Sequence, residues 1–374
     1  MHRLFVTVVL AVIGIFGYFS ILGLIQRNGW AEMFAEAISR EESSKKVYLG
    51  ISPLDLVLHH FVGFFYPCVS VERPELSLFA AYFAGQALPL HTALVLEGLR
   101  NGNKSTIISF SMCWGLTYQT IPVGIIMAVY CVTHIWTSVL SASFTPLAIV
   151  DLLSIDAIQL HSVKGAMTLG YIIPTMLLAL PSPSWISNQT QYTFLALWQF
   201  FPLWVSLWQF ALASLVRFLD LVPASAQRTS SSRLGYGRRV YCYILSITSV
   251  FHLGPLLYII SPQLRAAIFT EARSADFGAV FMPMSVLSPH LVESIAEGCQ
   301  SLLQYDMYCA SSAALVWVGY LSYVSSGQSM AALAKTAFKS MARMTIVGPG
   351  GAVLWALWDR DEDALRNLSV KEKI

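Results

Sequence analysis

Long apolar runs separated by short polar segments make up most of the chain. The first run extends from Leu4 to Ile25, and further runs lie near 51–69, 76–96, 107–134, 164–181, 193–217, 240–260, 306–325 and 342–359. A helix needs about 20 apolar residues to cross the hydrocarbon core of a bilayer. The pattern therefore predicts an all-α fold, a polytopic transmembrane helical bundle of about nine spans, and seven to nine spans are compatible with it.

The residues that flank and interrupt these runs indicate which of the runs are spans and how many domains the chain has. The first run follows His2 and Arg3 but has no small-x-small cleavage site, so we expect a retained helix rather than a signal peptide. We expect the charged segment 26–46 to be a loop, and the runs near 51–69 and 342–359 to be either spans or re-entrant segments. Because no internal repeat and no long polar linker is present, we expect one integral membrane domain over 1–374.

Composition supports lipid as the solvent of this chain. Hydrophobic residues make up 56% of it and charged residues only 12%, with a mean hydropathy of +0.61, which is unusual for a soluble domain. The net charge of +2 is not concentrated in a basic patch, so we expect no nucleic-acid partner. The six cysteines form no C-x-x-C pair, and a Cys299–Cys309 disulfide is expected only if their segment is lumenal.

The positions of basic residues suggest an orientation. Arginines cluster in the loop 218–239, which the positive-inside rule places in the cytosol together with the loop 326–343. With nine spans, the N-terminus is then cytosolic and the C-terminus lumenal. The sequons at Asn103, Asn188 and Asn367 are all expected on the lumenal side, where glycosylation occurs.

Ionisable residues inside apolar runs are costly to bury and therefore indicate functional sites. Asp55 and His59 lie one helical turn apart and either share a proton or form an interfacial hydrogen bond. The third run contains Gln86 and His91 and ends at Glu97, three residues before Arg100. The Glu97–Arg100 pair is either a weak surface ion pair or, if shielded from water, the polar rim of a pocket.

Aromatic and amide side chains recur in two further runs. Trp114, Tyr118 and Gln119 lie on successive turns, followed by His134, and a second group comprises Trp198, Trp204 and Trp208. Such aromatic rings either face lipid or provide the electron-rich wall that a carbocation needs. Asp151 and Asp156 fall in a loop, where we expect solvated or capping residues.

Several chemistries have no motif in this chain. Clustered carboxylates of the D-D-x-x-D or N-D-x-x-D type, which hold magnesium and diphosphate, are absent. The chain also has no phosphate-binding loop, no H-E-x-x-H helix and no G-x-S-x-G elbow. We therefore expect no metal and no cofactor.

Six stretches carry a resemblance to a known family. They are GISPLD at 50–55, FFYP at 64–67, LEGLRNGN at 96–103, WGLTYQ at 114–119, GYIIPT at 170–175 and LWQFFPLW at 197–204. In this order they resemble the integral membrane terpene cyclases of fungal meroterpenoid clusters, of the ascofuranone and macrophorin type, and related membrane proteins of indole-diterpene clusters. Asn101 departs from the family pattern, in which a basic residue is expected.

The resemblance implies a membrane-bound terpene cyclase of secondary metabolism that cyclises an isoprenoid chain by protonating an alkene or an epoxide, without ionisation of a diphosphate. It implies a lipophilic prenylated substrate that enters from the bilayer, and an endoplasmic reticulum location. Asp55 and Glu97 are then the acid candidates, and Arg100 and Gln119 organise them. The substrate-binding candidates are His59, Trp114, Tyr118, Trp198, Trp204 and Trp208. We expect Asp55, Glu97 and Gln119 to converge on one cavity.

Two other function classes fit a polytopic helical chain. A transporter would show an inverted repeat with broken helices at matching positions, and no such symmetry is seen. A noncatalytic scaffold of a biosynthetic complex has no sequence signature. An apolar cavity with one or two carboxyl groups favours the enzyme, whereas a path through the protein favours transport.

Overall fold

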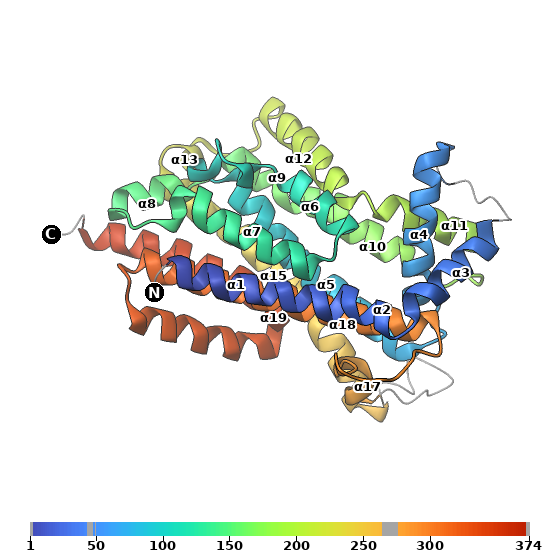
Figure 1. Ribbon diagram of the computed structural model, residues 1–374. Helices are drawn as coiled ribbons and strands as arrows, with labels where there is room; N and C mark the ends of the chain where they lie inside the picture. The colour runs from blue at the N-terminus through green and yellow to red at the C-terminus, as the bar shows by residue number, and fades with distance from the viewer. Residues whose placement is uncertain (1–2, 43–47, 49, 264–275, 372–374) are drawn as a thin grey trace.

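The computed structural model describes residues 3–42, 48, 50–263 and 276–371, and within these ranges the regular elements are helices without any strand (Figure 1). The all-α prediction is therefore confirmed. A chain in lipid must pair its backbone groups internally, and a helix does so within each segment.

The helices follow the predicted apolar runs, with breaks that the runs did not show. The first half comprises α1 (Arg3–Gly17), η1 (Tyr18–Leu22), α2 (Gly23–Arg27), α3 (Trp30–Glu42), α4 (Ser52–Val69), α5 (Pro74–Leu99), η2 (Asn101–Asn103), η3 (Ile107–Ser109), α6 (Ser111–Thr120), α7 (Val123–Thr137), η4 (Val139–Ser141) and α8 (Pro146–Leu153). The second half comprises α9 (Ala157–Met167), η5 (Thr168–Ile172), α10 (Ile173–Leu178), α11 (Asn188–Trp198), α12 (Phe201–Phe218), α13 (Ala224–Gln227), α14 (Ser230–Tyr236), α15 (Arg238–Ile260), α17 (Phe277–Phe281), α18 (Ile295–Ser325) and α19 (Met330–Lys371).

Five helices among the described residues are long and apolar enough to cross a membrane, or six if the bent pair 146–153 and 157–178 counts as one span. The predicted number of about nine is not confirmed. Two predicted spans are divided next to prolines. The run 107–134 divides at Pro122, the N-cap of α7, and the run 193–217 divides at Phe200, the N-cap of α12, whose second residue is Pro202.

The Gly-rich stretch of the last predicted span is a kink inside α19. Gly348 adopts a φ of 69°, which favours glycine, and Pro349 follows it. The side chain of Gln86 on α5 accepts the backbone N–H of Gly350 at 2.9 Å. The kink therefore brings α19 into close contact with α5.

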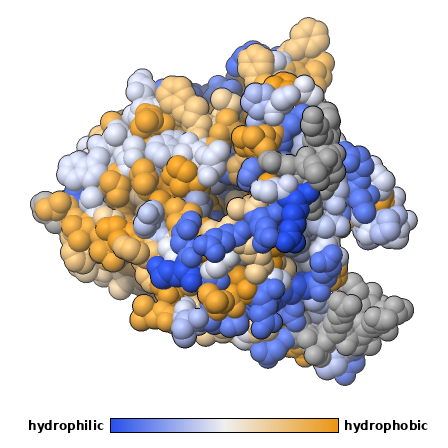
Figure 2. All heavy atoms as spheres, turned by 45° about the vertical axis from the view of Figure 1, so that its right-hand side comes forward, coloured by the Kyte–Doolittle hydropathy of each residue, from blue (hydrophilic) through white to orange (hydrophobic). Residues whose placement is uncertain are grey.

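Helix α18 lies at the centre of the bundle. It packs against α1, α5, α7 and α19, and α1 runs along it for much of its length (Figure 1). Large apolar side chains on α1 and α12 face outward: Phe5 is 61% exposed and Phe218 85% exposed. Hydrophobic residues also cover much of the left-hand part of the face in Figure 2. Such surface is suited to lipid.

Two local expectations are wrong. The charged segment 26–46 is helical over α3 rather than a loop, and residues 43–47 lie outside the described part. Cys299 and Cys309 both belong to α18, where ten residues of helix separate them by about 15 Å. They cannot form a disulfide with each other, and both thiols are free.

The predicted separation of the loop 218–239 from the C-terminus is also wrong. Arg238, at the end of this loop, donates two hydrogen bonds to Glu362, the second at 2.7 Å, and these bonds lower the pKa of the Glu362 carboxyl. Ser230 likewise donates to Asp151 at 2.7 Å. The start of α1 and the C-terminal end of α19 both lie in the left-hand part of Figure 1, and α19 packs against α8. The arginine-rich loop and the C-terminal end of α19 therefore share one end of the bundle.

The sequons accordingly have different environments. Asn103 is fully buried, and its side chain donates to the Glu97 carbonyl at 2.8 Å and accepts from Ser138 at 2.6 Å, so the prediction of a glycan there is wrong. Asn367 is exposed on α19, at the same end as Arg238, and not opposite to it as expected. Asn188 is exposed at the start of α11.

Candidate functional site

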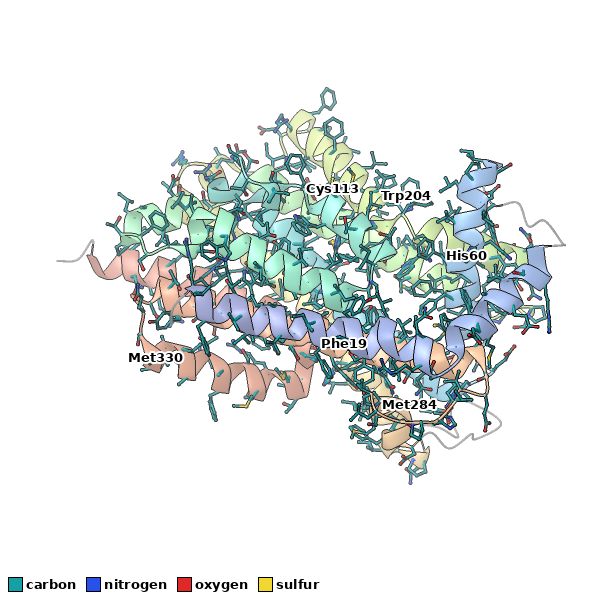
Figure 3. The ribbon with its side chains drawn as sticks, viewed as in Figure 1. Phe19, His60, Cys113, Trp204, Met284 and Met330 are labelled. Carbon is teal, nitrogen blue, oxygen red and sulfur yellow. The ribbon has the colours of Figure 1, made fainter. Side chains whose placement is uncertain are left out.

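An apolar cavity of about 280 Å³ lies among α3, α4, α5, α6, α7, α11, α12 and α18. Its aromatic lining consists of Phe34, Phe61, Phe64, Phe65, Phe83, Tyr118, Tyr171, Trp198 and Phe201. Its other lining residues are aliphatic apart from a few polar ones, namely His60, His91, Gln119, Thr120 and Asp306. In Figure 3, His60 marks the α4 side of this region.

The aromatic wall is a set of rings in mutual contact. Phe201 stands edge-on to Tyr171, with centroids 4.7 Å apart, and lies 5.4 Å from Trp198. Trp198 in turn contacts Phe65 at 5.3 Å. The wall is fixed by hydrogen bonds at its edges, since the Tyr171 hydroxyl donates to the Ala84 carbonyl at 2.7 Å. These rings present a preorganised electron-rich surface.

Three polar side chains, those of His91, Tyr118 and Gln119, lie together on the cavity wall. The Tyr118 hydroxyl lies 2.7 Å from Nδ1 of His91, while Nε2 of His91 is buried without a hydrogen-bond partner among the described residues. Gln119 donates to the backbone carbonyl of Gln199 at 3.2 Å. The pair of His91 and Tyr118 therefore offers one imidazole nitrogen that is free to exchange a proton.

Asp306 is the one carboxyl group among the described residues that line this cavity. It lies on α18, is 6% exposed, and accepts the backbone N–H of Gly124 at 2.6 Å. No arginine, lysine or histidine of the described ranges forms an ion pair with it. Gly124 is in the first turn of α7, where unpaired N–H groups favour a negative charge. The Gly124 N–H would therefore partly offset the cost of a negative charge on Asp306.

The sequence interpretation missed Asp306 because it began the apolar run at this residue. Helix α18 in fact begins at Ile295, eleven residues earlier, which places Asp306 three turns inside the helix. The turns before it contain the polar residues Gln300, Ser301 and Gln304, so the apolar run does not extend over them. A helix start at Ser294, which caps Glu297, was the available signal.

A second group of buried charges lies at the other end of α5. Glu97, fully buried, accepts from Nε of Arg100 at 2.6 Å and from a guanidinium nitrogen of Arg360 on α19. Nε2 of His134 on α7 lies 3.1 Å from the other carboxylate oxygen. Because the interior is shielded from water, the Glu97 carboxylate is balanced by two cations rather than by solvent.

Arg100 extends the group to two more elements, α8 and α15, and adds a second contact with α19. It donates to the carbonyl of Leu153, the last residue of α8, at 2.7 Å, to the Tyr241 hydroxyl on α15 at 3.2 Å and to Asp361 on α19 at 3.1 Å. Tyr241 also donates to Asp361 at 2.7 Å. We call Glu97, Arg100, His134, Tyr241, Arg360 and Asp361 the buried ion cluster. Its formal charge is zero with neutral histidine, and it ties five helices together at one end of the bundle.

Comparison with known proteins identifies the family. The model of the CtvD domain matches residues 5–365, which is nearly the whole chain. The chain belongs to the CtvD domain family. It is similar to the protein named terpene cyclase ascI of Acremonium egyptiacum, with 29% identity over 91% of this chain and 87% of that protein.

Two other relatives carry the same kind of name. Terpene cyclase ctvD of Aspergillus terreus is 24% identical over 94% of this chain and 97% of that protein. Terpene cyclase penA of Penicillium crustosum is 25% identical over 78% of this chain and 77% of that protein. No solved structure matches the chain. The resemblance to a family of fungal terpene cyclases is therefore confirmed.

In this CtvD-family chain, the expected convergence of Asp55, Glu97 and Gln119 on one cavity is wrong, because only Gln119 lines it. Asp55 accepts the backbone N–H groups of Tyr48 and Gly50 at 3.2 and 3.0 Å and thus organises the start of α4. Glu97 belongs to the buried ion cluster.

The substrate-binding candidates are also divided. Tyr118 and Trp198 line the cavity, whereas His59, Trp114, Trp204 and Trp208 do not. His59 faces the Tyr48 hydroxyl at 3.2 Å, and Trp208 is 42% exposed. Trp204 lies on α12 near Cys113 of α6 (Figure 3). The expectation for Asp156 is confirmed, since its side chain caps the first turn of α9.

Proposed function

We propose that the protein is a membrane-bound terpene cyclase that closes rings in the isoprenoid chain of a lipophilic prenylated substrate, by protonating an alkene or an epoxide inside the aromatic cavity. The observation that carries the proposal is Asp306, the one carboxyl group that the described residues contribute to the wall of an apolar, ring-lined cavity. The names of the relatives in the family support the reaction class.

The chemistry of the cavity suits a cationic reaction. Protonation of an epoxide oxygen breaks one C–O bond, leaves positive charge on carbon, and lets the electron pair of the next alkene form a C–C bond. The faces of Phe201, Tyr171 and Trp198 stabilise such charge. The apolar lining also keeps water away, so that the cation is not quenched before the ring closes.

Two polar groups of the cavity donate and accept the protons of the reaction. Asp306 delivers one proton from its carboxyl group, and its conjugate base accepts the Gly124 N–H at the start of α7. The final carbocation loses a proton to a base, for which His91 Nε2 is available. One proton is released for each proton delivered, so the reaction is an isomerisation. Exchange with water returns His91 and Asp306 to their starting states.

Replacement of the acid by its amide tests the proposal. Asp306→Asn keeps size and polarity but removes the proton donor, and we expect turnover in microsomes to fall by roughly 10²–10⁴-fold. The measurement is product formation, by mass and ring count, from a panel of prenylated phenols and their terminal epoxides at matched protein levels. Asp151→Asn, an exposed carboxyl outside the cavity, is the control and should retain activity.

The same assay compares Asp306 with the acids predicted from sequence. If Glu97→Gln or Asp55→Asn abolishes turnover while Asp306→Asn leaves it near normal, the acid is one of those residues and the assignment to Asp306 is wrong. Movement of substrate across sealed vesicles without any change in its mass would instead indicate a transporter.

A further inference from the structure

A second apolar cavity of about 400 Å³ adjoins the first. The two share four lining residues, Phe65, Phe83, Trp198 and Leu303, which therefore form the partition between them. Either volume alone lies near or below the lower end of the roughly 300–1,000 Å³ that ligand pockets occupy. A single elongated ligand that extends through both fits better than a ligand confined to one.

The second cavity reaches the outside of the bundle. Val71, between α4 and α5, is 47% exposed and Met176 on α10 is 58% exposed, and both line it. Asp306 on α18 lines only the first cavity, whereas these two residues line only the second. A ligand that enters past Val71 and Met176 would therefore lead with one end toward Asp306 and leave the other end in the second cavity.

The second cavity has one polar feature that points to a ligand. The Ser77 hydroxyl on α5 is buried without a hydrogen-bond partner among the described residues, and Ser77 lines the cavity. A buried hydroxyl without a partner costs free energy unless a ligand satisfies it. No lysine or arginine is part of the described lining, so the cavity suits an uncharged group rather than a diphosphate.

We propose that the second cavity binds the uncharged, hydroxylated ring of the substrate, with Ser77 hydrogen-bonded to a ring oxygen, while the isoprenoid chain extends past the shared partition into the first cavity. This inference rests on the proposed function and assigns the place where the ring of its substrate binds. Positions 84 and 87 separate the two cavities experimentally. Ala84 lines the second cavity and Ala87, about one turn later on α5, lines the first.

The experiment compares two epoxides in microsomes: a farnesylated resorcinol with a terminal epoxide, and the corresponding farnesyl methyl ether epoxide, which has no ring. Ala84→Phe fills the ring cavity and should lower kcat/KM about tenfold for the resorcinol relative to the ringless compound. Ala87→Phe should impair both substrates alike. Ser77→Ala should raise KM about fivefold for the resorcinol but not for its analogue with hydrogen in place of the hydroxyls.

The outcomes separate the two proposals. If the wild-type protein converts neither epoxide, the proposed function and this inference both fail. If it converts both, and Ala84→Phe and Ser77→Ala affect them equally, the ring does not occupy the second cavity and the cyclase proposal stands. Should Ala84→Phe lose all activity, the Ser77→Ala comparison decides, because this small change leaves the packing intact.

Discussion

At the scale of single residues, Glu97 and Asp306 show how the neighbours of a buried carboxyl group suit it to a structural or a chemical role. Glu97 accepts from Arg100 and Arg360, whereas Asp306 accepts a backbone N–H and lines the aromatic cavity. The first carboxylate balances cations that have no access to water. The second is placed beside a substrate.

Glu97→Gln should therefore destabilise the protein. The substitution leaves two buried guanidinium groups with only Asp361 as counter-charge, and breaking a buried ion pair in this way costs about 3–5 kcal/mol. Thermal unfolding of the detergent-purified protein should show a clear fall in Tm. Arg238→Gln is the control, because the Arg238 side chain is 54% exposed and its pair with Glu362 is worth less than about 1 kcal/mol. Equal Tm values for both variants would contradict a structural role for the ion cluster.

At the scale of elements, close approach of helices depends on glycine. A Cβ added to Gly170 in η5 would lie 2.5 Å from the backbone nitrogen of Val205 on α12. The clash is with backbone, so one of the two helices would have to shift to accommodate it. The adjacent Tyr171 belongs to the aromatic wall. The distance between these two elements therefore sets the shape of the cavity.

Gly170→Ala should lower stability by about 1–3 kcal/mol through overpacking and should also reduce turnover, since it displaces Tyr171. Gly254→Ala is a matched control in α15, where an added Cβ meets nothing within 4 Å and alanine is the better helix former. Unfolding and product formation are measured for both variants. A Gly170→Ala protein with normal Tm and normal products would show that the two helices separate easily.

At the scale of the whole molecule, the structure changes the expected orientation. The arginine-rich loop 218–239 and the C-terminal end of α19 lie at one end of the bundle, where Arg238 bonds to Glu362. The positive-inside rule then places this end in the cytosol. Asn188 belongs to α11, which packs against α4 rather than against this end.

Asn188 should therefore be the glycosylated sequon, and Asn103 and Asn367 should not. In microsomes, Asn188→Gln should abolish the mobility shift caused by endoglycosidase, while Asn367→Gln should leave it unchanged. A cysteine introduced near Asp363 should be labelled from the cytosolic side of sealed vesicles. Glycosylation of Asn367 would place the arginine-rich end in the lumen.

The sequence by itself determined what depends on local composition. Apolar runs require helices in lipid, so the helical class and the approximate place of each helix were predictable. The motifs around Glu97, Tyr118 and Trp198 were sufficient to suggest the family. Gln119, Tyr118 and Trp198 were among the candidates named from the sequence, and all three line the cavity.

Only the tertiary structure decided which of these residues meet. Glu97 is surrounded by partners from α7 and α19, and Asp306 meets a cavity whose walls come from helices throughout the chain, from α3 to α18. The hydropathy pattern cannot predict either contact, because burial and counter-charge depend on residues far away in the chain. The kink at Gly348 and the bond from Arg238 to Glu362 likewise fix how the helices return across the bundle. The cavity and the orientation of the chain follow from that long-range packing, which no local pattern records.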